Sequence, residues 1–280
     1  MQGRTVIITG ANTGIGKETA RELARMGAGV ALVCRSASRG AAARQEISAD
    51  TGSDKITLHL ADFGSLAQVR SLATELQAAY PVIDVLVNNA GLVLPKRMTS
   101  EDGHEMTFAV NHLAPFLLTN LLLENIQAAP AGRIINVSST SHKSGTIHRD
   151  DLNLSPKYSA MQAYSQSKLA NVLFTRELAR RLGGHGVTAN ALHPGVVATD
   201  FGRDFTGVVK ILFRFFRLFF IGAAKGARTS IYLASSTEVD GITGEYFDKC
   251  KVAKTAPLAR DMDLAAWLWA ESERLVGLEQ

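Results

Sequence analysis

Residues 9–18 read Thr9-Gly10-Ala11-Asn12-Thr13-Gly14-Ile15-Gly16-Lys17-Glu18, a glycine-rich turn between an apolar run and an amphipathic stretch. Glycine adopts backbone angles that other residues avoid, so such a turn lets the main chain pass close to a phosphate. A helix that begins in the turn offers its unpaired N–H groups and the positive end of its dipole to the anion. An ordinary strand-to-helix connection is the alternative. The expected phosphate contacts are Gly10, Asn12, Thr13, Gly14, Ile15 and Gly16.

Short apolar runs alternate with amphipathic stretches along the whole chain, which is typical of βαβ units and a parallel sheet. We expect strands at residues 5–8, 29–34, 56–60, 82–87, 133–138, 187–192 and 245–247. The expected helices lie at residues 16–26, 38–51, 65–79, 103–126, 158–182 and 225–234. Right-handed crossovers would place helices on both faces of a doubly wound α/β sheet of about seven strands, with ligands at the carboxyl ends of the strands.

The chain shows no internal repeat and no Pro/Gly/Ser-rich linker, so we expect residues 1–280 to form a single dinucleotide-binding and catalytic domain. Its composition, 46% hydrophobic and 20% charged with a net charge of +4, excludes a disordered chain or a coiled coil. Cys34 and Cys250 belong to no Cys/His cluster, so we expect reduced thiols and no metal site. The N-terminus lacks the pattern of a signal peptide, which predicts a cytoplasmic protein.

Tyr164 and Lys168 are four residues apart in an expected helix, so their side chains leave the same face. A phenol has a pKa near 10, and a nearby ammonium would favour the phenolate and make the pair useful for general acid/base catalysis. Ser138, at the end of the expected strand at 133–138, would donate a hydrogen bond to a substrate oxygen beside Tyr164. Taken alone, the Tyr/Lys pair is also compatible with an incidental surface pair.

Several motifs occur in the order and approximate spacing of the short-chain dehydrogenase/reductase family. They are Thr9-Gly10-x3-Gly14-x-Gly16, Asn88-Asn89-Ala90-Gly91, Asn111, Ser138, Tyr164-x3-Lys168 and Pro194-Gly195. The chain resembles that family over nearly its whole length, and residues 110–120 and 163–171 look like its retinol-dehydrogenase-like branch. The resemblance implies a Rossmann-type fold and a catalytic group of Asn111, Ser138, Tyr164 and Lys168. In this family an asparagine at the place of Asn111 holds a water that passes protons to the lysine.

The end of the second expected strand, Val33-Cys34-Arg35-Ser36, indicates which dinucleotide binds. NAD-binding sheets usually carry a carboxylate here for the ribose 2′-OH, and a 2′-phosphate would be repelled by it. Arg35 instead offers a planar fork of donors and Ser36 a hydroxyl, so we expect NADP(H). A solvated loop arginine is the alternative. Asp62 resembles the family residue that binds the adenine amine, although an Asp that caps the next helix would look the same.

Further cofactor contacts are expected where small or amide residues follow strands. Asn88-Asn89-Ala90-Gly91 follows the strand at 82–87, and we expect it to stabilise the end of the sheet while it borders the cofactor; an Asx-type turn that closes the strand is the alternative. The segment after the sixth strand resembles the family segment that contacts the nicotinamide amide. The expected contacts are Asn88, Ala90, Gly91, Tyr164, Lys168, Pro194, Gly195, Val197 and Thr199.

Residues 208–221 are apolar apart from Lys210, Arg214 and Arg217, which would form one basic stripe on a helix. Such a helix is too short and too charged to span a bilayer. Three roles remain open: a core or dimer helix, a lid over an apolar substrate within residues 200–224, and peripheral contact with a membrane surface. The apolar helices around 112–123 and 162–173 could pair with a second copy in a homodimer or simply pack in the core.

These features predict an NADP(H)-dependent oxidoreductase. Hydride would move between nicotinamide and an apolar aldehyde, ketone or alcohol, retinal-like compounds included, with Tyr164 as the general acid/base. The alternative is a regulatory or scaffold protein that binds NADPH with little turnover. A nucleic-acid partner is not expected, because the basic residues are scattered and no motif for reading nucleic acid is present.

Overall fold

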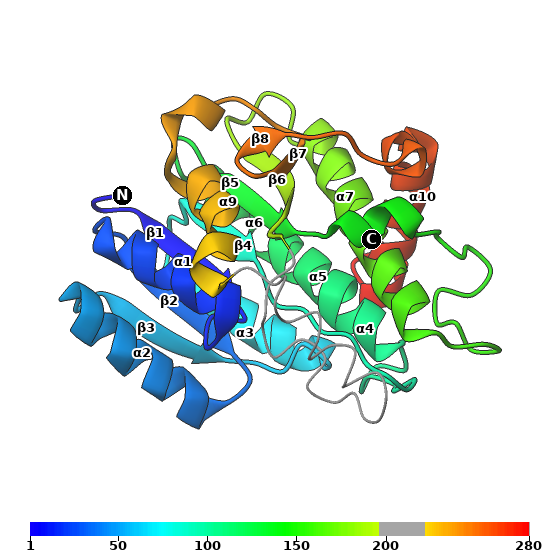
Figure 1. The fold of residues 1–280 in the computed structure, drawn as a ribbon, viewed down its shortest axis with the longest axis horizontal. Helices are drawn as coiled ribbons and strands as arrows, with labels where there is room; N and C mark the ends of the chain where they lie inside the picture. The colour runs from blue at the N-terminus through cyan, green and yellow to red at the C-terminus, as the bar shows by residue number, and fades with distance from the viewer. Residues whose placement is uncertain (196–221, 280) are drawn as a thin grey trace.

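A computed structural model describes residues 1–195 and 222–279, which form a three-layer α/β structure around one sheet (Figure 1). The sheet has eight strands in the order β3-β2-β1-β4-β5-β6-β7-β8. They are β1 (Thr5–Thr9), β2 (Gly29–Cys34), β3 (Ile56–Leu60), β4 (Val85–Asn88), β5 (Arg133–Val137), β6 (Thr188–His193), β7 (Tyr246–Asp248) and β8 (Lys251–Val252). The pairings from β3 to β7 are parallel and β8 is antiparallel. The predicted doubly wound α/β fold is confirmed, with β8 as an unpredicted edge strand.

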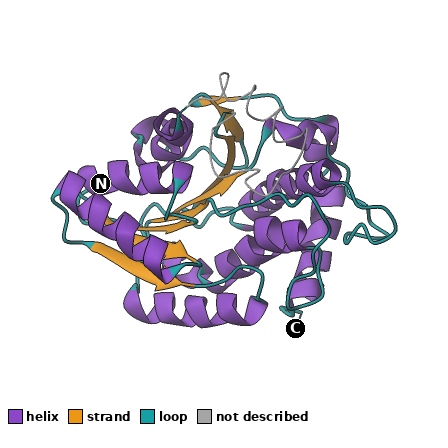
Figure 2. Ribbon diagram, turned by 60° about the horizontal axis from the view of Figure 1, so that its bottom comes forward, coloured by secondary structure: helices purple, strands orange, loops and turns teal. Residues whose placement is uncertain are grey.

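Both faces of the sheet are buried, because successive side chains of a strand point to opposite sides. In β1, Val6 and Ile8 pack on one side with α1 (Gly14–Arg25), α2 (Ala37–Thr51) and α9 (Ala223–Ser235). Ile7 packs on the other side, where the covering helices are α3 (Leu66–Ala79), α5 (Ala114–Leu121) and α7 (Ala160–Arg181). Figure 2 shows the strands between these two layers of helices.

The expected single helix at residues 103–126 is divided in the structure. It consists of α4 (Met106–Phe108), a π-helical turn η1 (Ala109–Leu113), α5 and α6 (Leu123–Gln127). Pro115, in the first turn of α5, has no N–H to donate to the carbonyl of Asn111 four residues before it, which disfavours a regular α-helix there. The irregular turn therefore coincides with one of the predicted site residues.

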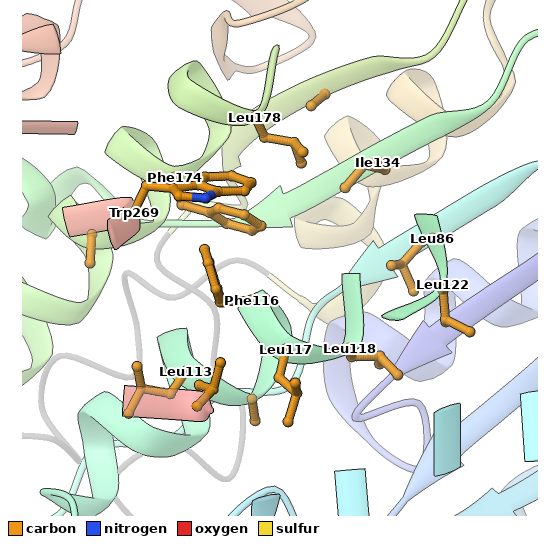
Figure 3. Packing of buried hydrophobic residues seen from close by; sticks show 14 of the residues in the cluster. Leu86, Leu113, Phe116, Leu117, Leu118, Leu122, Ile134, Phe174, Leu178 and Trp269 are labelled. Atoms are coloured by element: carbon orange, nitrogen blue, oxygen red, sulfur yellow. The ribbon is translucent and has the colours of Figure 1, made fainter. Parts of the chain in front are cut away.

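Helix α10 (Met262–Val276) is a second difference from the sequence-based expectation. Asp261 caps it by accepting a hydrogen bond from the Leu264 N–H at 2.9 Å. Trp269 of α10 packs on Phe116 of α5 and Phe174 of α7, with ring centroids 4.9 and 5.8 Å away (Figure 3). Helix α10 thus packs in the core on Phe116, which belongs to the stretch 112–123 that was also compatible with a homodimer.

The remaining short elements connect these layers. They are the 3-10 turns η2 (Thr140–Ser144), η4 (Thr237–Val239) and η5 (Pro257–Arg260). None of the helices in the described ranges is long and apolar enough to cross a membrane.

Candidate active site

A cleft of about 680 Å³ opens at the carboxyl ends of the strands, where β1 and β4 lie side by side and the chain order of the sheet reverses. Most of the predicted site residues border this cleft. They are Gly10, Asn12, Thr13, Gly14, Ile15, Gly16, Arg35, Asp62, Ala90, Gly91, Ser138, Tyr164, Lys168, Pro194 and Gly195. Val197, Thr199 and residues 208–221 lie outside the described residues.

The glycine-rich turn has the geometry that a phosphate-binding turn requires. Gly10 and Gly14 have φ values of +66° and +56°, which favour glycine. A side chain at position 16 would clash with the turn, because a Cβ built on Gly16 would lie 2.5 Å from the Gly10 carbonyl oxygen and 2.5 Å from Asn89 Nδ2. The side chain of Thr13, the N-cap of α1, makes no capping hydrogen bond within the described part of the chain. The first residues of α1, Gly14, Ile15 and Gly16, thus border the cleft at the end of the helix where a pyrophosphate would bind.

Thr9 ties the ends of β1 and β4 together. Its Oγ1 accepts hydrogen bonds from the N–H groups of Asn89 and Ala90, both at 2.9 Å. The Asn89 amide in turn donates to the Thr9 carbonyl at 2.7 Å. Asn89 therefore supports the glycine turn, although it was not among the expected cofactor contacts.

Asn88 was predicted to contact the cofactor, but its side chain lies in the core. Its Nδ2 donates to Thr119 Oγ1 at 2.9 Å and to Asn136 Oδ1 at 2.8 Å, and the residue is 3% exposed. Asn136 continues this chain by donating to Thr175 Oγ1 at 2.9 Å. Asn88 thus connects β4 to β5 and α5, while Asn89, Ala90 and Gly91 form the wall of the cleft.

Arg35 and Asp62 border the cleft at the ends of β2 and β3, whereas Ser36, also predicted as a cofactor contact, does not line it. Arg35 Nη1 lies 3.5 Å from Asp62 Oδ2, and the Arg35 side chain is 66% exposed. Ser36 is the N-cap of α2, and its hydroxyl accepts a hydrogen bond from the Arg39 N–H at 3.4 Å. Asp62 accepts from the Gly64 N–H at 2.9 Å and does not cap α3, whose N-cap is Ser65. The guanidinium of Arg35 therefore stands at the cleft mouth beside one carboxylate.

Tyr164 and Lys168 lie together on α7, as their spacing predicts. The Lys168 ammonium is 5.5 Å from the centre of the Tyr164 ring and donates to the Val137 carbonyl at 3.0 Å. Burial lowers the pKa of Lys168 to about 8. Burial also raises the pKa of Tyr164 to about 12, and a hydrogen bond with Ser139 opposes this effect. This direction is opposite to the lowered phenol pKa expected from the pair, because burial favours the neutral phenol.

The two serines after β5 have different surroundings. Ser138 borders the cleft, but its hydroxyl donates to the main-chain carbonyl of Lys168 at 2.7 Å, and the residue is 1% exposed. The Ser139 hydroxyl interacts with the Tyr164 phenol. The serine hydroxyl that lies against the Tyr164 phenol is therefore that of Ser139 and not that of Ser138, which was expected beside it. Neighbouring residues at a strand end point in opposite directions, which explains the exchange.

Asn111 does not border the cleft, although it lies behind one wall of it. Its Oδ1 accepts from the Leu92 N–H at 2.8 Å, and its Nδ2 donates to the Leu92 carbonyl at 2.9 Å and to Ser167 Oγ at 3.0 Å. Gly91 packs closely on both Asn111 and Lys168, since a Cβ built on Gly91 would lie 3.3 Å from Asn111 Oδ1 and 3.4 Å from Lys168 Nζ. Asn111 thus fixes the wall after β4 against the helix that carries Tyr164 and Lys168.

One part of the cleft is apolar, a feature that none of the sequence motifs indicates. Its lining includes Leu92, Val93, Leu94, Met98, Met106 and Val110. The phenol of Tyr158 donates to the Leu94 carbonyl at 2.8 Å and Arg97 Nε donates to the Asn153 carbonyl at 3.0 Å, which holds this lining in place. An apolar wall beside Tyr164 and Lys168 suits an apolar ligand with one polar group.

Comparison with known proteins agrees with this geometry. The family model described as short chain dehydrogenase matches residues 4–207. The chain is 48% identical to human retinol dehydrogenase 13 over 99% of its own length and 86% of that protein.

Two solved structures are similar over most of the chain. An uncharacterized protein from Mycobacterium paratuberculosis has a TM-score of 0.80 and 36% identity, with 99% of this chain and 94% of that chain covered. RhlG of Pseudomonas aeruginosa, solved as an active-site complex with NADP, has a TM-score of 0.71 and 25% identity, with 88% of this chain and 94% of that chain covered. The family match, the identity to retinol dehydrogenases and the doubly wound sheet together show that this chain belongs to the short-chain dehydrogenase family, in its retinol-dehydrogenase-like branch, and is an oxidoreductase.

Proposed function

We propose that this oxidoreductase depends on NADP(H) and interconverts apolar aldehydes or ketones with their alcohols. The observation that carries the proposal is the position of Tyr164, paired with Lys168 on α7, in the same cleft as the glycine-rich turn after β1. When bound, the dinucleotide supplies or accepts the hydride. The apolar lining from Leu92 to Met106 supports an apolar substrate, and the similarity to retinol dehydrogenase 13 points to the same class.

The cleft supports binding of a dinucleotide on steric and electrostatic grounds. The backbone of Gly10 and Gly14 and the start of α1 would hold the pyrophosphate. Because these glycines carry no side chain, the phosphate oxygens could reach the main-chain N–H groups. Arg35 would bind the 2′-phosphate, with Ser36 and the first turn of α2 beside it. Asp62 would accept a hydrogen bond from the adenine amine. The NADP complex of RhlG supports this choice of nucleotide.

The protein residues would then control the proton. In the reducing direction the neutral Tyr164 phenol donates its proton to the carbonyl oxygen as negative charge develops there. Ser139 Oγ donates a second hydrogen bond to the same oxygen, in the role first expected of Ser138. The Lys168 ammonium, held on the Val137 carbonyl, stabilises the phenolate that remains, and Asn111 maintains the wall that faces Lys168.

The proposal is tested by NADPH oxidation over a panel of aldehydes and ketones of graded chain length. We expect kcat/KM to rise with chain length, because longer substrates bury more apolar surface against the cleft wall. NADH at the same concentration should give a lower kcat/KM. The rival function, NADPH binding without useful turnover, predicts saturable NADPH binding and no oxidation with any member of the panel.

A further inference from the structure

His142 is a buried titratable residue that the proposed chemistry does not use. It lies in η2, three residues after Ser139, and is 0% exposed. Its Nδ1 is 2.7 Å from the main-chain carbonyl oxygen of Ser139, and its Nε2 is 3.3 Å from the main-chain nitrogen of Ala256. Both ring nitrogens therefore have partners on the main chain, and these partners come from segments far apart in the sequence.

The two partners determine the tautomer of the ring. A carbonyl oxygen can only accept a hydrogen bond, so Nδ1 must carry the proton. The Ala256 N–H can only donate, so Nε2 must be the unprotonated acceptor. Burial lowers the pKa of His142, which favours this neutral form. The imidazole is thus a fixed bridge that runs from the Ala256 N–H through the ring to the Ser139 carbonyl.

The ring itself is held by packing. The aromatic ring of Tyr246, on β7, lies edge-on to it with centroids 4.6 Å apart and an interplanar angle of 61°. The Ser139 carbonyl also accepts a hydrogen bond from the His142 N–H at 3.1 Å, and Ser139 Oγ accepts from the Ser141 N–H at 3.2 Å. These contacts hold the backbone at Ser139, the residue whose hydroxyl interacts with Tyr164.

We propose that His142 is a positioning residue that acts through Ser139. Its Nδ1–H holds the Ser139 carbonyl so that the Ser139 hydroxyl stays aimed at the substrate oxygen, and its Nε2 attaches the ring to the segment before η5. This inference rests on the proposed function, because the role of Ser139 belongs to that proposal. It adds a link between the catalytic strand end and the C-terminal part of the chain.

Two substitutions separate the two ends of the bridge. The amide of His142→Asn can donate from the place of Nδ1 to Ser139, whereas the longer amide of His142→Gln reaches the place of Nε2. We expect His142→Asn to keep kcat within about threefold of the parent and His142→Gln to lose about 10- to 100-fold in kcat, with the KM for NADPH unchanged in both. Thermal unfolding of each variant controls for packing. Equal losses of kcat in the two variants would overturn the inference.

A spectroscopic readout separates this inference from the proposed function. Long-range ¹H–¹⁵N correlation spectra report which imidazole nitrogen carries the proton, and comparison with His142→Asn assigns the His142 signals. The inference predicts an Nδ1–H tautomer at pH 7, and an Nε2–H tautomer contradicts it whether or not the protein turns over. An Nδ1–H tautomer in a parent protein without carbonyl reductase activity would contradict only the proposed function and leave the bridge itself established.

Discussion

The ammonium of Lys168 donates a hydrogen bond to the main-chain carbonyl of Val137 at 3.0 Å and so joins α7 to the carboxyl end of β5. The lysine is 3% exposed and lies 5.5 Å from the centre of the Tyr164 ring. One buried cation thus connects the helix that carries the phenol to the strand end that carries Ser139. Its ionisation provides the first prediction.

The kcat/KM for carbonyl reduction should fall as pH rises above about 8. The pKa of Lys168 is lowered by burial to about 8, so the ammonium is lost above that pH, and with it the charge that stabilises the phenolate of Tyr164. The pH dependence of kcat/KM with saturating NADPH measures this. Lys168→Met should be slower at every pH and should lack the fall near pH 8, and an unchanged profile in this variant would argue against the assignment.

The free energy of unfolding should also depend on Lys168. Its pKa in the folded protein, about 8, lies below its ordinary value of 10.5. Below pH 8 both states carry the proton, and between pH 8 and 10 only the unfolded state does, so this group makes folding more favourable as pH rises. Urea unfolding at pH 7, 8, 9 and 10 should show that the parent gains stability relative to Lys168→Met across this window. A constant difference between the two proteins would show that the lysine is not desolvated.

Ser138→Ala and Ser139→Ala should have different effects. Ser139→Ala removes the hydroxyl beside Tyr164 and the cap of η2, so kcat should fall about 100-fold and the free energy of unfolding should fall by about 1 kcal/mol. Ser138→Ala removes a buried hydrogen bond to the Lys168 carbonyl, so it should cost about 1 kcal/mol of stability and a smaller part of kcat. Steady-state kinetics and thermal unfolding of both variants check this. The reverse order of kcat values would return the catalytic role to Ser138.

Arg35→Asp should raise the KM for NADPH by about 10- to 100-fold and change the KM for NADH much less, because charge-assisted hydrogen bonds to the 2′-phosphate are lost. Lys17→Ala is the matched control. The Lys17 ammonium is 3.0 Å from Glu46 and does not border the cleft, so Lys17→Ala should keep the parent protein's preference for NADPH over NADH. Equal effects of Arg35→Asp on both nucleotides would remove the assignment of NADP(H).

Local patterns predicted the sheet, the glycine-rich turn and the Tyr164–Lys168 pair, because each depends on a spacing within one strand, turn or helix. They could not decide between adjacent residues at a strand end. Successive side chains of a strand point to opposite sides, so moving a strand end by one residue reverses which side chain faces the cleft. The composition does not reveal such a shift, and for this reason the core position of Asn88 and the direction of the Ser138 hydroxyl could not be predicted. Ser139 was missed for the same reason.

The irregular turn at Asn111 and the C-terminal helix α10 were harder to predict from the sequence. The π turn at Asn111 follows from Pro115, a signal that can be read from the sequence once the helix is known to pass that residue. Helix α10 has apolar residues at helical spacing and a capping Asp261, and both could have predicted it. What the sequence could not show is the target of α10, since its contacts with Phe116 and Phe174 join residues far apart in the chain.

The role of Tyr164 is tested most directly by Tyr164→Phe, which removes one hydroxyl and keeps the ring. Carbonyl reduction and NADPH affinity should be measured on the same preparation, the first by NADPH oxidation and the second by fluorescence titration. We predict a loss of about 10²- to 10⁴-fold in kcat with the Kd for NADPH nearly unchanged. A variant that reduces its best carbonyl substrate at the parent rate would contradict the assignment of Tyr164 as the proton donor.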